Sequence, residues 1–129
     1  MAKVKWPKLP RYLIPLFQCA NVYLCRSRGE WYQASEALGC QRGDVDMLSG
    51  ATQTYCNAET GEALYLLGVF DGELSTLAHE CAHIAFYVCR DTGVVVHEEG
   101  ANETYCYLVG GLFKFGEGHL KKPAGLEPV

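Results

Sequence analysis

Two histidines, His79 and His83, stand in a short stretch of sequence that is suited to metal chemistry. Residues four positions apart lie on one face of a helix, so both imidazoles can bind a single metal ion. Glu80 follows the first histidine directly, where it is placed to accept a proton from water rather than to bind the metal. A catalytic zinc ion takes three protein ligands and keeps one open position, so this H-E-x-x-H motif requires a third ligand.

Glu103, which lies twenty residues after His83 and inside a predicted helix, is one candidate for this third ligand. Glu98 and Glu99 are alternatives, although a carboxylate that precedes a helix more often serves as a favourable charge on the helix dipole. Cys106 lies three residues after Glu103 and is a further alternative. The cysteine inside the motif is predicted to be a packing residue, because the x positions of H-E-x-x-H point away from the metal.

This arrangement resembles the gluzincins, the thermolysin-like metallopeptidases, in which a Gly-Ala-x-Asn-Glu segment follows H-E-x-x-H by about twenty residues. The corresponding segment here ends in Asn102-Glu103. The resemblance implies that His79, His83 and Glu103 bind zinc and that Glu80 is the general base. It also implies a metallopeptidase that hydrolyses a peptide bond with one zinc ion as its cofactor.

The resemblance covers residues 77–106, about a quarter of the chain. The family has an aspartate four residues after the glutamate ligand, whereas this sequence has Tyr107. In size the chain is similar to the minimal ImmA/IrrE-like and SprT-like peptidases, which are common in phages and prophages, and this similarity implies a phage-type origin. The side chains considered for stabilising the transition state are His97, Tyr105, Tyr107 and His119.

The helices and strands predicted around these residues indicate an α+β fold. In this fold a small antiparallel or mixed sheet packs on the motif helix and on the helix that carries Glu103. Hydrophobic periodicity and turn signals give the following elements. They are strands within 12–25, a helix over 30–38 capped by Ser27, a hairpin of strands 51–58 and 63–70, a helix over 74–89 capped by Asp71 and followed by Gly93, a strand at 94–96, and a helix over 99–115 that closes at Gly116.

Composition and charge restrict the class of protein to which the chain can belong. A chain of 129 residues that is 49% hydrophobic predicts a single domain over 1–129, with a basic, solvated arm at about 1–11 and a loose tail at about 117–129. The net charge of −4 provides no basic field for phosphates, so nucleic-acid binding is not expected. Seven cysteines, an odd number without a CxxC pair, and no signal or membrane-spanning segment predict a cytoplasmic protein whose thiols mostly pack in the interior.

Two functions follow from these features. The first is a zinc-dependent metallopeptidase that acts on a protein or peptide, and strand 63–70 could pair with the extended substrate as an added strand. The second is a catalytically silent, zincin-like domain that binds metal or another protein. The sequence does not determine the substrate, the oligomeric state or the metal that is bound in the cell.

Overall fold

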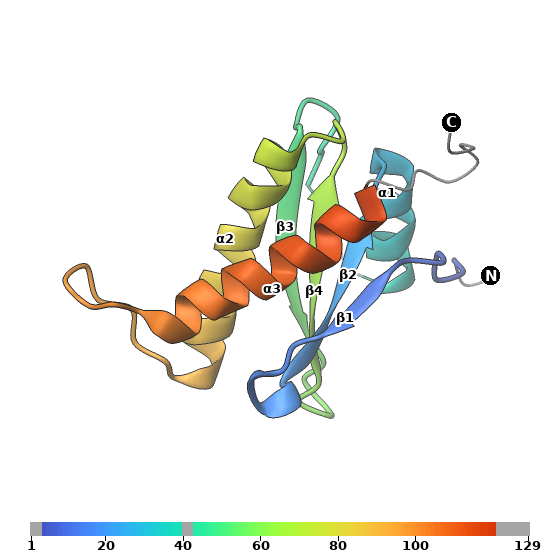
Figure 1. The fold of residues 1–129 in the computed structure, drawn as a ribbon. Coiled ribbons are helices and arrows are strands. Elements are labelled where there is room, and N and C mark those ends of the chain that lie inside the picture. Colours follow the sequence, from blue (N-terminus) through green and yellow to red (C-terminus); the bar gives the residue numbers. More distant parts are fainter. Residues whose placement is uncertain (1–3, 40–42, 121–129) are drawn as a thin grey trace.

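The computed structural model describes residues 4–39 and 43–120. Figure 1 shows a four-stranded sheet with helices on both faces. The elements are β1 (Arg11–Leu13), the 3-10 helix η1 (Leu16–Gln18), β2 (Ala20–Cys25), α1 (Arg28–Ala37), β3 (Gly50–Cys56), β4 (Ala63–Val69), α2 (Leu74–Thr92) and α3 (Glu103–Leu120). This is the predicted α+β class, with α2 as the helix that carries the motif.

The sheet is mixed and has the strand order β1-β2-β4-β3. β2 and β4 are parallel, whereas β1 pairs with β2 and β3 pairs with β4 in antiparallel fashion. The predicted hairpin is therefore confirmed. The prediction that strand 63–70 pairs with a substrate is wrong, because β4 lies between β2 and β3 and has no free edge. The strand with a free edge next to β4 is β3.

Two hydrophobic clusters lie on opposite faces of the sheet. On one face, Tyr65, Leu67 and Val69 of β4 pack with α2 and α3, which cross this face in Figure 1. On the other face, Leu66 packs with Trp31 of α1. Because β4 is buried on both faces, its sequence is a continuous apolar run rather than an alternating one.

The ends of α2 differ slightly from the prediction. Glu73, not Asp71, occupies the N-cap position, and the Asp71 carboxylate accepts hydrogen bonds from the Glu73 backbone N–H (3.0 Å) and the Thr76 hydroxyl (2.7 Å). Asp71 thus stabilises the start of the helix from two residues earlier. The helix ends at Gly93, as predicted, where φ is +77° and glycine avoids the strain of a Cβ atom.

α3 is shifted along the sequence relative to the prediction of 99–115. It begins at Glu103 and continues through the predicted stop at Gly116 to Leu120, so the predicted tail from 117 is helical up to 120. Gly116 does not end the helix because it is a buried contact point, where α3 lies against Leu77 of α2. Residues 94–96 form no strand. The rest of the predicted tail lies outside the described residues.

The N-terminal arm, predicted to be a solvated tail, makes packing contacts through its backbone and through Trp6. The Trp6 ring lies edge-on to Tyr23 at 5.0 Å, and the Gln33 side-chain amide donates to the Lys5 carbonyl. The Leu24 N–H donates to the Pro10 carbonyl, which ties the arm to β2. The basic side chains of Lys5, Lys8 and Arg11 nevertheless stay exposed, and Lys3 lies outside the described residues.

The cysteines are divided between the interior and the surface. Cys25, Cys81 and Cys89 are buried, whereas Cys56 and Cys106 are exposed, so the prediction of interior thiols holds for part of the set. Cys40 lies outside the described residues. Among the helices of the described chain, none combines the length and the apolar character that a membrane crossing requires.

The contact between α2 and α3 gives a stability prediction. A Cβ atom at Gly116 would lie 2.5 Å from Leu77 Cδ1 in a closely packed interior. We expect Gly116→Ala to lower the free energy of unfolding by about 1–3 kcal/mol, because overpacking outweighs the better helix propensity of alanine. The change is measured by urea denaturation.

Gly110→Ala is the matched control, since a Cβ atom there meets no atom within 4 Å. It should raise the free energy of unfolding by about 0.5–1 kcal/mol through helix propensity alone. Equal effects of the two substitutions would contradict the packing described for α2 and α3.

Candidate metal centre

The two motif histidines are brought together on the exposed side of α2. Their Nε2 atoms lie 3.2 Å apart, within hydrogen-bonding distance. Two nitrogen ligands at about 2.0–2.1 Å from a tetrahedral zinc ion are themselves about 3.3 Å apart. The imidazoles therefore stand at the separation that a shared zinc ion requires.

Glu80 lies next to this pair but in a different environment. Its side chain is only 8% exposed, and its carboxylate belongs to a group with the two imidazoles in which all ligand atoms lie within 4.8 Å of one another. Burial raises the pKa of Glu80 above its usual value, although the neighbouring charges of His79 and His83 oppose this shift. A carboxyl group whose pKa is raised by burial is suited to accept and release a proton.

Gly50 at the start of β3 makes this burial possible. A Cβ atom at Gly50 would lie 2.7 Å from Thr76 Cγ2, 2.8 Å from the Gly68 carbonyl oxygen and 3.0 Å from Glu80 Cγ. Only glycine lets the strand approach α2 this closely, and so β3 covers the Glu80 side chain.

A small hollow connects the cluster to the surface. It has a volume of about 330 Å³ and is lined by residues from the start of β3 and from the first half of α2. His79 and Glu80 are both part of its wall. A small group that enters this hollow therefore reaches the imidazole and the buried carboxylate together. The remaining lining residues are Ser49, Gly50, Ser75 and Thr76.

Tyr87 is a site residue that the sequence analysis did not identify. Its ring stacks on His83 with a centroid distance of 6.5 Å, and its hydroxyl oxygen accepts a hydrogen bond from the Thr52 hydroxyl of β3 at 3.4 Å. Tyr87 therefore links the second histidine to the edge strand. The signal was present in its position four residues after His83, on the same helical face.

Glu103 lies outside the cluster of candidate ligand atoms. It is the first residue of α3, it is exposed, and it shares a helical face with Tyr107, which is 78% exposed. The buried residues of α3, such as Leu108 and Leu112, occupy another face. The structure thus does not bring Glu103 to the histidines, and its role as the third ligand remains a prediction. The alternatives Glu98 and Glu99 are also exposed and outside the cluster.

Asn102 explains where α3 begins. Its side chain accepts a hydrogen bond from the His97 N–H (2.9 Å) and donates to the carbonyl groups of His97 (2.6 Å) and Gly100 (3.0 Å). Its backbone has a φ of +53°, in the left-handed region that asparagine tolerates. Asn102 therefore folds the loop before Glu103 and delays the helix relative to the predicted start at 99.

The other candidates are spread over the structure. Tyr105 packs on Phe86 at 4.5 Å and His119 on Phe115 at 5.1 Å, whereas His97 lies in the exposed loop. The prediction that Cys81 packs in the interior is confirmed, and burial raises its pKa to about 12. The remaining candidates are Tyr107, on the exposed face of α3, and Cys106, which is exposed and outside the cluster.

No protein-family model, curated protein or solved structure matches this chain. The case for a metal centre therefore depends on the motif and on its geometry in the structure.

The contact at Gly50 can be tested by a single substitution. Gly50→Ala should lower the free energy of unfolding by about 1–3 kcal/mol, because the added methyl group meets the backbone of β4 as well as α2. Gly43→Ala is the control, since a Cβ atom there has no neighbour within 4 Å. Thermal and urea denaturation measure both. If Gly50→Ala has the same free energy of unfolding as the control, β3 does not pack closely against Glu80.

Proposed function

We propose that this protein is a zinc-dependent metallopeptidase in which His79 and His83 bind the metal and Glu80 is the general base. The observation that carries the proposal is the pairing of two exposed imidazoles, 3.2 Å apart at Nε2, with a buried carboxylate in the same cluster. A purely structural metal site has no use for a buried carboxylate beside its first ligand.

Bound zinc would polarise a carbonyl group and lower the pKa of a coordinated water molecule. Glu80 would accept the proton of the attacking water and deliver it to the leaving amine, since burial has already raised its proton affinity. Tyr87 would hold the His83 ring in place through stacking and through its hydroxyl contact with β3. These roles together amount to hydrolysis of an amide bond.

Glu103 completes this proposal as the third ligand. The start of α3 lies beside the histidine-bearing part of α2, because Tyr105 packs on Phe86, three residues after His83. The hydrogen bonds of Asn102 fix the loop that leads into this turn. Two histidines and one carboxylate form a ligand set that suits a catalytic zinc ion.

One observation favours the second candidate function, a catalytically silent metal-binding domain. Glu103 does not lie within the cluster formed by His79, Glu80 and His83. Without a third protein ligand the metal would bind weakly, and the cleft would serve for interaction rather than hydrolysis. Metal content and hydrolysis distinguish the two functions.

The first prediction for this function concerns metal content. Protein purified without added metal and without a histidine tag should contain about one zinc ion per chain, measured by inductively coupled plasma mass spectrometry. His83→Ala should lose the metal, and Glu103→Ala should bind zinc at least about 10-fold more weakly. Glu99→Ala is the matched control, because Glu99 is also exposed and precedes α3.

Each outcome has a distinct meaning. Retention of zinc by His83→Ala would contradict the metal site itself. Equal zinc affinity of Glu103→Ala and Glu99→Ala would contradict the assignment of the third ligand and leave the histidine pair in place.

The second prediction concerns hydrolysis. Glu80→Gln should keep the zinc content of the wild type and lower the rate of peptide hydrolysis by about 10²–10⁴-fold, because the amide cannot accept the proton. The rate is measured on denatured protein substrates by detection of new amino termini. A wild type that binds zinc but leaves every substrate intact would favour the silent domain over the peptidase.

A further inference from the structure

The exposed face of α2 lacks the charges that a solvated helix usually carries. Between Leu74 and Cys89 the only acidic or basic side chain besides the two histidines is that of Glu80, which is buried. Helices that face water normally place charged residues on their outer side. Here Leu74 and Phe86 are instead 40% and 49% exposed. This face is therefore more typical of a contact surface than of a solvated one.

His79 and His83 protrude from this face. Each histidine is preceded by an alanine, Ala78 or Ala82, whose side chain ends at Cβ. Both imidazoles are exposed, and their Nε2 atoms lie 3.2 Å apart. They are thus the longest of the exposed side chains in the stretch 75–83 of α2. A metal ion bound to this pair would lie in front of the helix, where a second molecule can reach it.

Two imidazoles alone leave a zinc ion with open positions. Zinc in a closed protein site has four ligands in tetrahedral geometry. In the part of the chain that the structure describes, the histidines share their cluster of ligand atoms with Glu80 alone, and that side chain is only 8% exposed. Glu103 lies outside the cluster. An ion on this pair therefore has two positions that a second pair of imidazoles could fill.

A second copy of the chain provides such a pair. Most homodimers have twofold symmetry, in which the same surface patch of both copies meets. A twofold axis through the ion would bring His79 and His83 of the second copy to the two open positions. The Glu80 carboxylate of each copy lies within 4.8 Å of its own histidine ligand atoms, so the two carboxylates would offset the positive charge of the ion.

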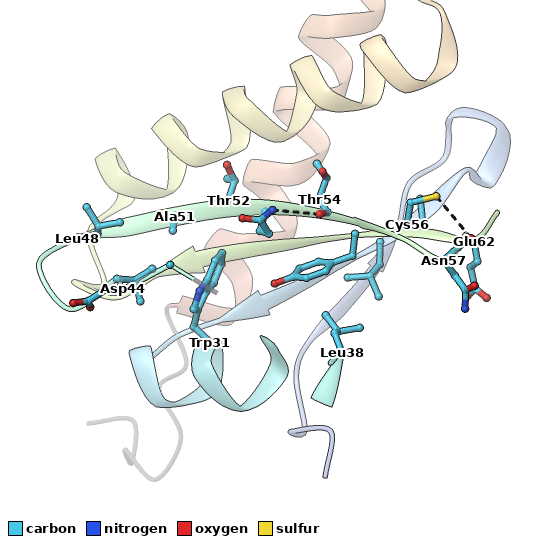
Figure 2. Close-up of a pocket in the computed structure, with 16 residues that line it drawn as sticks. Trp31, Leu38, Asp44, Leu48, Ala51, Thr52, Thr54, Cys56, Asn57 and Glu62 are labelled. Carbon is cyan, nitrogen blue, oxygen red and sulfur yellow. Dashed lines mark hydrogen bonds between the residues drawn. The ribbon is translucent and has the colours of Figure 1, made fainter. Parts of the chain in front are cut away.

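The surroundings of the histidines suit contact between two identical surfaces. A twofold contact brings equivalent residues close together, so like charges near the axis would repel. The charged residues of α2 that follow the histidines are Arg90 and Asp91, which pair with each other at 2.9 Å. Beside α2, the uncharged residues Thr52 and Thr54 point from β3 to the side of α2, away from Trp31, as Figure 2 shows.

We infer that two copies of this chain share one zinc ion through His79 and His83 of each copy, and that this dimer is a closed, inactive form of the site. An ion with four protein ligands has no open position for water or for a substrate. The second copy would compete with Glu103 for the same positions on the ion. The inference rests on the proposed function, since it uses the same histidine pair and assigns it a regulated state.

The ratio of zinc to chain determines which form is present. When zinc is scarce, two chains must share an ion, whereas in excess zinc each chain binds an ion of its own and the dimer separates. Dimer formation should therefore rise and then fall as zinc is added. Aggregation caused by non-specific zinc binding would only increase, so the two processes are distinguishable.

The test is a zinc titration of the full chain after its metal has been removed with a chelator. Gel filtration with light scattering should show the mass of two chains at half an equivalent of zinc and of one chain at about a tenfold excess. The zinc content of the separated species should be half an ion per chain in the dimer and one in the single chain. Magnesium should give no dimer, because it prefers oxygen ligands.

A variant of the contact face separates dimer formation from metal binding. Ala78→Arg places a long cation beside His79 in both copies and should weaken the dimer at least about 10-fold through repulsion. It should still bind one zinc ion per chain, because Ala78 is exposed and is not a ligand. Ala58→Arg is the matched control, at an exposed position in the turn between β3 and β4. Unfolding curves of both variants are measured alongside.

The outcomes separate the shared ion from the peptidase. A wild type that binds one zinc ion per chain and stays a single chain at every ratio would overturn the dimer and leave the peptidase in place. A dimer that forms without zinc, that persists in excess zinc or that Ala78→Arg retains in full would overturn it as well. A dimer with one shared ion, together with Ala78→Arg that holds zinc but cleaves no denatured protein, would support the shared site and refute the peptidase.

Discussion

The close approach of β3 to α2 at Gly50 is the constraint on which the candidate site depends. Successive residues of a helix are turned by about 100°, so His79 and Glu80 cannot point in the same direction. The strand at Gly50 covers the side to which Glu80 points and leaves the side of the histidines exposed. One contact therefore creates two environments within a single helical turn, and both are needed if a metal and a proton acceptor are to act on the same water.

The position of α2 is fixed in turn by its contacts on the other side. Gly116 allows α3 to lie against Leu77, and Tyr105 packs on Phe86 near the opposite end of the contact. The two helices thus pack in antiparallel fashion, with the start of α3 near the later turns of α2. The hydroxyl group of Tyr65 donates to Asp91 at 2.7 Å and ties the end of α2 to the central strand. The H-E-x-x-H motif lies on α2 between these two sets of contacts.

Local sequence signals were sufficient for the motif helix, the Ser27 cap and the β3–β4 hairpin, because each depends on residues close together in the chain. The strand order could not be predicted, since the parallel pairing of β2 with β4 joins segments about forty residues apart. The start of α3 was missed because it depends on three side-chain hydrogen bonds of Asn102 rather than on hydrophobic periodicity. Spacing selected Glu103 as the candidate third ligand, but spacing does not determine which face of the helix the residue occupies.

β3 borders the hollow of Glu80 at Gly50 and, from Ala51 onward, lines a groove of about 760 Å³. The groove residues Trp31 and Leu38 lie on the opposite face of the sheet from the histidines. A substitution in the groove therefore does not reach the metal ligands through direct contact. Any recognition by the groove and the proposed hydrolysis at α2 are therefore separable, and loss of one in a variant would not imply loss of the other.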